Sequence, residues 1–113
     1  MRYIIAIIQP NKLSDVLQKL EEKEIHLVTV SEVMGRGRQK GVGEVYRSHK
    51  ENGSLLRKVK LEIAVNDEFV PVTLKAIQEA AYSGNVGDGK IFVLDMQQVL
   101  RIRTGETGKE AIG

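Results

Sequence analysis

The apolar residues of this chain recur with two different periods, and the order in which those periods alternate limits the folds that it can adopt. Residues 2–9 (RYIIAIIQ) are rich in β-branched side chains and end at Pro10, which predicts a buried strand. In residues 11–24 leucine and valine recur at helical spacing, so this segment predicts an amphipathic helix. Residues 25–34 alternate again and predict a second strand.

The second half of the chain repeats this order. Residues 58–65 (KVKLEIAV) alternate strongly and predict a third strand. Residues 67–83 have an acidic start and apolar side chains at helical spacing, which predicts a second helix that begins near Pro71. Residues 90–96 (KIFVLDM) predict a fourth strand.

The predicted order β-α-β, loop, β-α-β is that of a ferredoxin-like α+β fold. In that fold two helices cover one face of an antiparallel four-stranded sheet. We expect a single domain over residues 1–113 with a long loop at about residues 37–56. Residues 97–105 predict a short turn and a last extended piece, followed by a mobile tail from residue 106. The second and third strands carry apolar residues on both faces, which predicts that another subunit covers the open face.

Composition excludes several classes of function. The chain has no Cys, so disulfides, thiol catalysis and cysteine-held metals are excluded. Three Tyr, two Phe and no Trp disfavour a base-stacking nucleic-acid surface. The sheet likewise lacks the aromatic residues that RNA-binding sheets of this kind display. His26 and His49 belong to no catalytic motif, and no general base for ATP hydrolysis is evident. With no catalytic motif in view, we expect that the protein is not an enzyme. The first apolar run is too short for a signal peptide or a membrane span, so we expect the protein to be cytoplasmic.

Three segments combine glycine with cationic side chains: residues 35–41 (GRGRQKG), 84–90 (GNVGDGK) and 101–105 (RIRTG). Glycine lets backbone amides approach an anion, and in an extended chain Arg101 and Arg103 would point the same way. Residues 84–90 follow the phosphate-loop pattern, but the next residues form a strand instead of supplying Ser or Thr and a helix. Each segment alone is more often a turn, a flexible loop or a solvated face. Together they favour a polyphosphate ligand.

As a set, these segments resemble the PII signal-transduction family, small trimeric regulators of nitrogen and carbon metabolism. The resemblance rests on AIIQPNKLSDV, TVSEVMGRGRQKGVGEVYR, GNVGDGKIFV and RIRTGE and covers nearly the whole chain. It implies a non-enzymatic homotrimer in which ATP and ADP, with AMP as a further candidate, compete for clefts between subunits. It also implies that the long loop docks on a target protein such as a membrane transporter or a metabolic enzyme.

The resemblance also implies roles for individual residues. Gly35, Arg36, Gly37 and Arg38 would line the nucleotide from the base of the long loop, while Gly87, Asp88, Gly89 and Lys90 would cradle its phosphates. Thr29, Glu62 and the backbone near Ala64 would lie by the adenine and ribose, and Arg101 and Arg103 would come from the adjacent subunit. Gln39 and Lys58 match positions used for 2-oxoglutarate and Mg²⁺, with Gln39 as the metal ligand.

The chain departs from the family pattern at several of these places. Glu51 stands where many members carry a modifiable tyrosine, and His49 stands where some carry a phosphorylated serine. Gln9 replaces a lysine, Arg36 an aromatic residue and Arg57 a proline. Two hypotheses therefore stay open: a sensor of energy state that binds ATP and ADP competitively, and a standard nitrogen-regulatory protein that senses 2-oxoglutarate with Mg-ATP.

Overall fold

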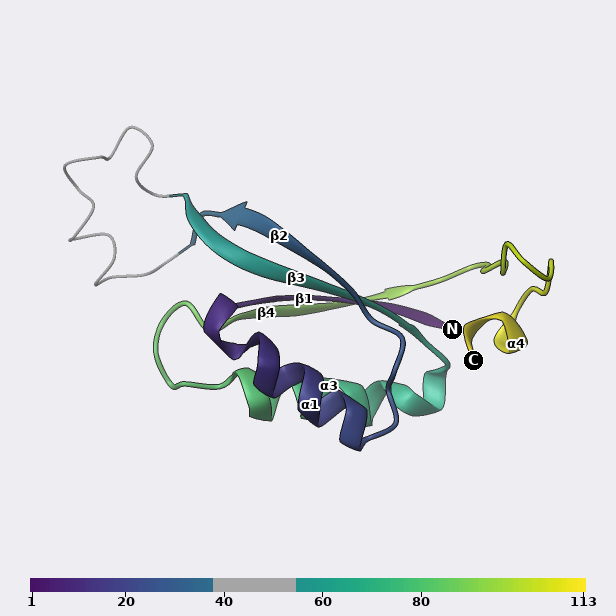
Figure 1. Ribbon diagram of the computed structural model, residues 1–113, viewed down its shortest axis with the longest axis horizontal. Helices are drawn as coiled ribbons and strands as arrows, with labels where there is room; N and C mark the ends of the chain where they lie inside the picture. The colour runs from purple at the N-terminus through teal and green to yellow at the C-terminus, as the bar shows by residue number, and fades with distance from the viewer. Residues whose placement is uncertain (38–54) are drawn as a thin grey trace.

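The computed structural model of the protein describes residues 1–37 and 55–113 (Figure 1). Four strands form one antiparallel sheet in the order β2-β3-β1-β4. The strands are β1 (Arg2–Ile8), β2 (Thr29–Gly35), β3 (Leu56–Val65) and β4 (Gly89–Asp95). Two helices, α1 (Leu13–Glu22) and α3 (Val70–Ala81), lie side by side on one face of the sheet. Each follows a short 3-10 turn, η1 (Pro10–Lys12) or η3 (Asp67–Phe69). The predicted βαββαβ order and the ferredoxin-like fold are confirmed.

The core lies between the sheet and the two helices. Alternate residues of β1, among them Ile4 and Ile8, are almost fully buried there, as is Leu61 of β3. They pack with Leu20 of α1 and Ile77 of α3 in one apolar cluster. Because side chains alternate along a strand, the intervening residues of β1 and β3 point to the opposite face, which neither α1 nor α3 covers.

The second strand begins later than the alternation in residues 25–34 predicts, because the chain first has to leave α1. Glu24 adopts a left-handed conformation with φ 64°, and the amide of Ile25 donates to the carbonyl of Leu20 at 2.9 Å. Ile25 is then buried in the core, 7% exposed, before the ladder to β3 starts at Thr29. The apolar residues at the start of this segment therefore serve the helix end instead of the sheet.

The expected extended piece is reduced to an isolated antiparallel bridge between Leu100 and Thr107, and a short helix stands in the expected mobile tail. Residues 102–104 form a turn, in which the amide of Gly105 donates to the carbonyl of Arg101 at 2.7 Å. The amide of Arg101 donates to the carbonyl of Glu106 at 2.8 Å, and a short helix, α4 (Lys109–Ile112), follows. Local hydrogen bonds across the turn thus replace the strand that the Arg-x-Arg pattern favoured.

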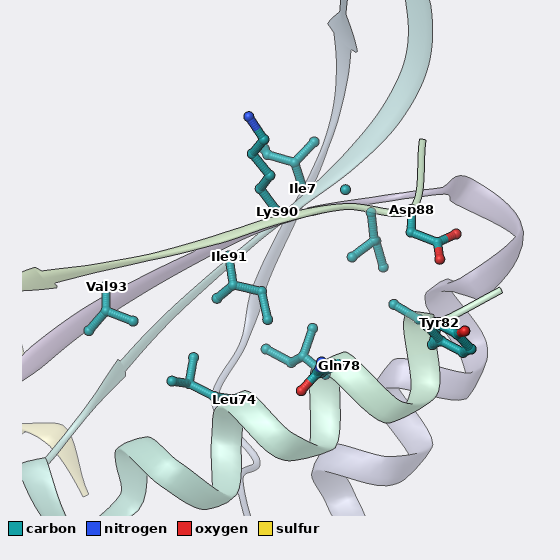
Figure 2. A pocket seen from close by; sticks show the side chains of 12 residues that line it. Ile7, Leu74, Gln78, Tyr82, Asp88, Lys90, Ile91 and Val93 are labelled. Atoms are coloured by element: carbon teal, nitrogen blue, oxygen red, sulfur yellow. The ribbon is translucent and has the colours of Figure 1, made fainter. Parts of the chain in front are cut away.

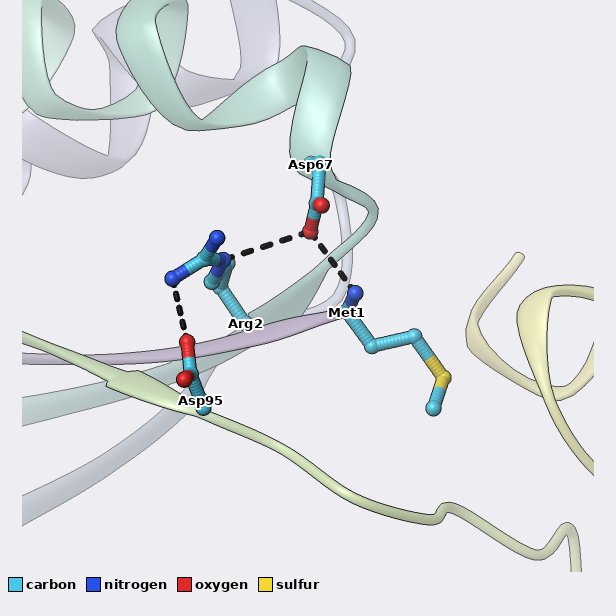
Figure 3. Close-up of polar contacts among 4 residues, drawn as sticks. All are labelled: Met1, Arg2, Asp67 and Asp95. Atoms are coloured by element: carbon cyan, nitrogen blue, oxygen red, sulfur yellow. Dashed lines mark hydrogen bonds and ion pairs between the residues drawn. The ribbon is translucent and has the colours of Figure 1, made fainter.

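A group of charged residues joins the start of β1 to its neighbours (Figure 3). Arg2 bonds to Asp67 of η3 at 3.3 Å and also to Asp95 at the end of β4. The ammonium of Met1 donates to Asp67 at 2.7 Å, and this bond is the main reason that the pKa of Asp67 is lowered. Since these groups are exposed, we expect the cluster to align the ends of the strands and to add little stability.

Candidate functional site

A cavity of about 720 Å³ opens where β2 ends and β3 and β4 begin. In the register of the sheet, Ile8 of β1 lies opposite both Val59 and Gly89, so the strand ends meet at this edge. Figure 2 shows Lys90 and Ile7 on the side of β4 away from α3, the side without helices. Seven residues singled out from the sequence line this cavity: Gly35, Arg36, Gly37, Lys58, Gly87, Gly89 and Lys90.

The described lining of this cavity is cationic. It contains the side chains of Arg36, Lys58 and Lys90 and no carboxylate. Lys58 is only 8% exposed, and this burial lowers the pKa of its ammonium group, while the negative charge of Asp88 acts in the opposite direction. A buried cation gains most from an anionic partner, so the cavity is suited to phosphate or carboxylate groups.

The tip of the glycine loop, residues 84–89, is tied to the sheet through one carbonyl. Gln9 Nε2 donates to the carbonyl oxygen of Gly87 at 2.8 Å, and Lys58 Nζ donates to the same oxygen at 3.2 Å. The sequence presented Gln9 only as a missing cation. Its hydrogen bond could not be found from local pattern, because the two partners are far apart in the chain.

The fold itself requires glycine at position 89, whether or not a ligand binds in the cavity. Gly89 has φ +110°, and a Cβ atom there would lie 1.8 Å from the carbonyl oxygen of Ile7. The β1–β4 pair therefore leaves no room for a side chain at this position. Gly89 lines the cavity with backbone alone.

The carboxylate of Asp88 turns away from the cationic cavity. It accepts hydrogen bonds from the amides of Ser83, at 2.8 Å, and Gly84, at 3.0 Å, and from the Ser83 hydroxyl. These bonds lower the pKa of Asp88, the bond from the Ser83 hydroxyl being the largest cause. The residue lines a second cavity of about 430 Å³, between β4 and α3, with Tyr82 and Gln78 (Figure 2). The Asp88 side chain therefore joins the two ends of the glycine loop to each other.

The remaining predicted residues that the structure describes do not line the cavity of their own chain. Arg101 contacts α4, which Figure 1 shows at the end of the molecule away from the glycine loop. Its guanidinium donates to the carbonyls of Glu110 and Ala111, both at 3.3 Å, and pairs with Glu106 at 3.4 Å. Arg103 is exposed in the adjacent turn.

The three residues expected near the adenine and ribose lie further along the open face of the sheet. Thr29 is the ladder partner of Glu62, and Ala64 is that of Tyr3. The Tyr3 hydroxyl donates a hydrogen bond to the carboxylate of Glu62. Arg38, Gln39 and most of the long loop lie outside the described residues.

Apolar lining residues were missed by the sequence analysis. Ile7, Val86 and Phe92 complete the cavity wall. Alternation along the strands could have placed Ile7 and Phe92 on the face away from the helices. Their position beside this cavity depends on how the strands pair, which the sequence alone does not give.

The family comparison decides what kind of protein this is. A family model described as Nitrogen regulatory protein P-II matches residues 1–106. The chain belongs to the nitrogen regulatory protein P-II family. P-II proteins are non-enzymatic signal transducers that respond to nucleotides, which confirms the expectation that this chain is not an enzyme.

Similar P-II proteins match over nearly their whole length. Nitrogen regulatory protein GlnK1 of Methanosarcina mazei is 51% identical over 99% of this chain and 97% of its own. Nitrogen regulatory protein P-II 1 of Methanothermobacter thermautotrophicus is 54% identical with the same coverage. Nitrogen regulatory protein P-II of Pasteurella multocida is 51% identical over 99% of this chain and all of its own.

The helices that the structure describes in this P-II chain are short. Within residues 1–37 and 55–113 none is long and apolar enough to cross a membrane. The longest among them, α3, has 12 residues.

Proposed function

We propose that this protein is a nitrogen-regulatory P-II signal transducer whose effector site is the cationic cavity, where ATP and ADP compete. The observation that carries the proposal is the convergence of Arg36, Lys58 and Lys90 with the glycine loop on one cavity of about 720 Å³. Cations and exposed backbone amides at one place suit a polyphosphate. The volume lies within the range usual for small-molecule sites.

The proposal includes assembly as a homotrimer. Arg101 and Arg103 shortly precede α4, which Figure 1 shows at the end of the molecule away from the glycine loop, so in the proposed assembly they meet a nucleotide in the cavity of another copy. The open face of the sheet also exposes Phe92 and Leu94, which are 47% and 46% exposed in the single chain. An adjacent subunit would cover these residues and supply Thr29, Glu62 and Ala64 beside the adenine and ribose.

Nitrogen regulation is better supported than a response to energy state alone. The relatives at about 50% identity carry names of nitrogen regulators. Lys58 is the least exposed cation of the cavity and could bind a carboxylate of 2-oxoglutarate. Mg²⁺ would reach the site with the ATP phosphates and take the side-chain oxygen of Gln39, a hard ligand suited to that ion. Residues 37–56 would then signal to a target such as a membrane transporter or a metabolic enzyme.

Calorimetric titration with ATP, ADP and AMP, each with and without 2-oxoglutarate and Mg²⁺, tests the proposal. We expect ATP to bind with a Kd in the micromolar range, which corresponds to roughly 8 kcal/mol, and 2-oxoglutarate to bind only with Mg-ATP. Lys58→Met should abolish the response to 2-oxoglutarate. Lys75→Gln, an exposed change on α3, is the matched control.

Two results would alter the conclusion. If no adenine nucleotide binds, or if sedimentation shows a monomer, the proposal is wrong. If ATP and ADP bind and compete but 2-oxoglutarate never does, the protein is a sensor of energy state.

A further inference from the structure

Gln9 and Lys58 share one hydrogen-bond acceptor, the carbonyl oxygen of Gly87. Their proximity follows from the register: Ile8, the last residue of β1, is paired with Val59, so the residue after it lies beside Lys58 of β3. Both side chains are partly or largely buried. A carbonyl oxygen has two lone pairs and accepts both bonds at once.

These two bonds fix the glycine loop relative to the sheet. The other side-chain hydrogen bonds described for residues 84–88 stay within the loop, since they join Asp88 and Ser83 to nearby amides. The internal bonds set the shape of the loop. The bonds from Gln9 and Lys58 set where Gly87 lies in the cavity wall.

The two donors differ in what an anion does to them. An anion in the cavity attracts the ammonium of Lys58, because a charged acceptor binds an ammonium more strongly than a neutral carbonyl does. The amide of Gln9 has no net charge and is not drawn away to the same extent. Without Gln9, ligand binding would loosen the wall that the ligand needs.

We propose that Gln9 is a positioning residue that holds Gly87 in place while Lys58 engages an anionic ligand. This inference rests on the proposed function, because it takes the cavity to be the nucleotide site. Glutamine in place of lysine at position 9 then has a specific consequence. One of the two donors to the Gly87 carbonyl carries no charge, so the charge of the ligand does not draw it away.

Three substitutions at Gln9 separate its hydrogen bond from its size and charge. Gln9→Met keeps the length and removes the donor, and Gln9→Glu replaces the donor with a carboxylate that repels the carbonyl. We expect ATP affinity to fall about three- to tenfold for Gln9→Met, which is the effect of one net hydrogen bond, and further for Gln9→Glu. Gln9→Lys restores a donor, but a charged one that an anion attracts, so it should hold Gly87 in place only in the ligand-free protein. Gln18→Met, on the exposed side of α1, is the matched control.

A second measurement reports on the loop directly. The amide N–H of Asp88 belongs to the same peptide group as the Gly87 carbonyl, so its NMR shift follows that hydrogen bond. Inorganic triphosphate should move this signal little in wild type and much more in Gln9→Met and in Gln9→Lys, since neither variant keeps an uncharged donor at position 9.

The possible outcomes distinguish the two proposals. If wild type binds ATP and the Gln9 variants bind it equally well, with an unchanged Asp88 response, the role of Gln9 is wrong and the nucleotide site stands. If wild type binds no ATP, both proposals fail. If ATP affinity falls in Gln9→Met but triphosphate moves the Asp88 signal no further in Gln9→Met and Gln9→Lys than in wild type, the loss is an effect of packing and the role of the hydrogen bond is wrong.

Discussion

The hydroxyl of Tyr3 on β1 donates a hydrogen bond to the carboxylate of Glu62 on β3, two residues that lie on the open face of the sheet. Glu62 is thus held by its own chain before any neighbour or nucleotide meets it. The hydrogen bond to Glu62 is the largest reason that the pKa of Tyr3 is raised, followed by burial and by the charge of Glu62.

This pair predicts a loss of stability at alkaline pH. Because the folded chain raises the pKa of Tyr3, the stabilisation is complete below the ordinary value of about 10 and is lost as pH rises through the raised pKa. Unfolding by denaturant, measured on wild type and Tyr3→Phe, should show a difference that is constant at neutral pH and shrinks in strong alkali. In Glu62→Gln the tyrosinate absorbance should appear at lower pH than in wild type. An unchanged titration in Glu62→Gln would contradict the assignment.

Replacement of Gly89 by alanine should disrupt the β1–β4 pair. Its Cβ would meet the backbone carbonyl oxygen of Ile7 at 1.8 Å, and φ +110° is strained for any side chain. We expect a loss of at least about 3 kcal/mol in the free energy of unfolding. Gly105→Ala is the control: φ is also positive, +75°, but no atom lies within 4 Å, so the loss should be about 1 kcal/mol. Equal losses for the two variants would show that the close approach to Ile7 is unimportant.

The bonds of Asp88 predict a loss of stability in acid. Its pKa is lowered in the folded chain, so the stabilisation is present above the ordinary value of about 3.9 and is lost as pH falls through the lowered pKa. Asp88→Asn should cost about 1 to 2 kcal/mol at neutral pH, and the difference from wild type should shrink in acid. Because the Ser83 hydroxyl supplies one of the bonds and alanine removes it, Ser83→Ala and the double variant should show non-additive losses. Additive losses would mean that the two residues act independently.

The two arginines of the C-terminal turn should respond differently to substitution. Arg101 bonds the last carbonyls of α4, whereas Arg103 is exposed. Arg101→Ala should release α4, seen as faster backbone motion of residues 109–112 in NMR relaxation, and also weaken ATP binding. Arg103→Ala should leave α4 ordered and weaken ATP more than AMP, because the lost partner is a distal phosphate. Release of α4 in both variants, or equal loss of ATP and AMP binding in Arg103→Ala, would argue against these assignments.

Much of the fold could be predicted because strands and helices impose different spacings on apolar residues. β1, β3, β4 and both long helices lie within one or two residues of the predicted ranges. The prediction failed where neighbouring hydrogen bonds decide the path of the chain. Ile25 caps α1 instead of starting β2, and Arg101 lies at a turn instead of on a strand.

The candidate site could be predicted only as a set of segments. Glycines and cations at residues 35–37 and 84–90 marked the two loops, and the register of the sheet brings them together around Lys58. The roles of the individual loop residues depend on where their side chains and carbonyl groups point, which the local sequence pattern does not give. Asp88 faces inward to Ser83, while the Gly87 carbonyl faces Gln9.

The amino-acid sequence by itself determined the order of strands and helices, the membership of the P-II family and the segments that carry positive charge. These properties follow from periodicity and from residue type, which are local. Tertiary structure alone decided that Gln9 and Lys58 meet at one carbonyl, that Gly89 must lack a side chain, and that Arg101 lies far from the cavity of its own chain. Each of these depends on which distant backbone lies alongside, and strand pairing is what brings those backbones together.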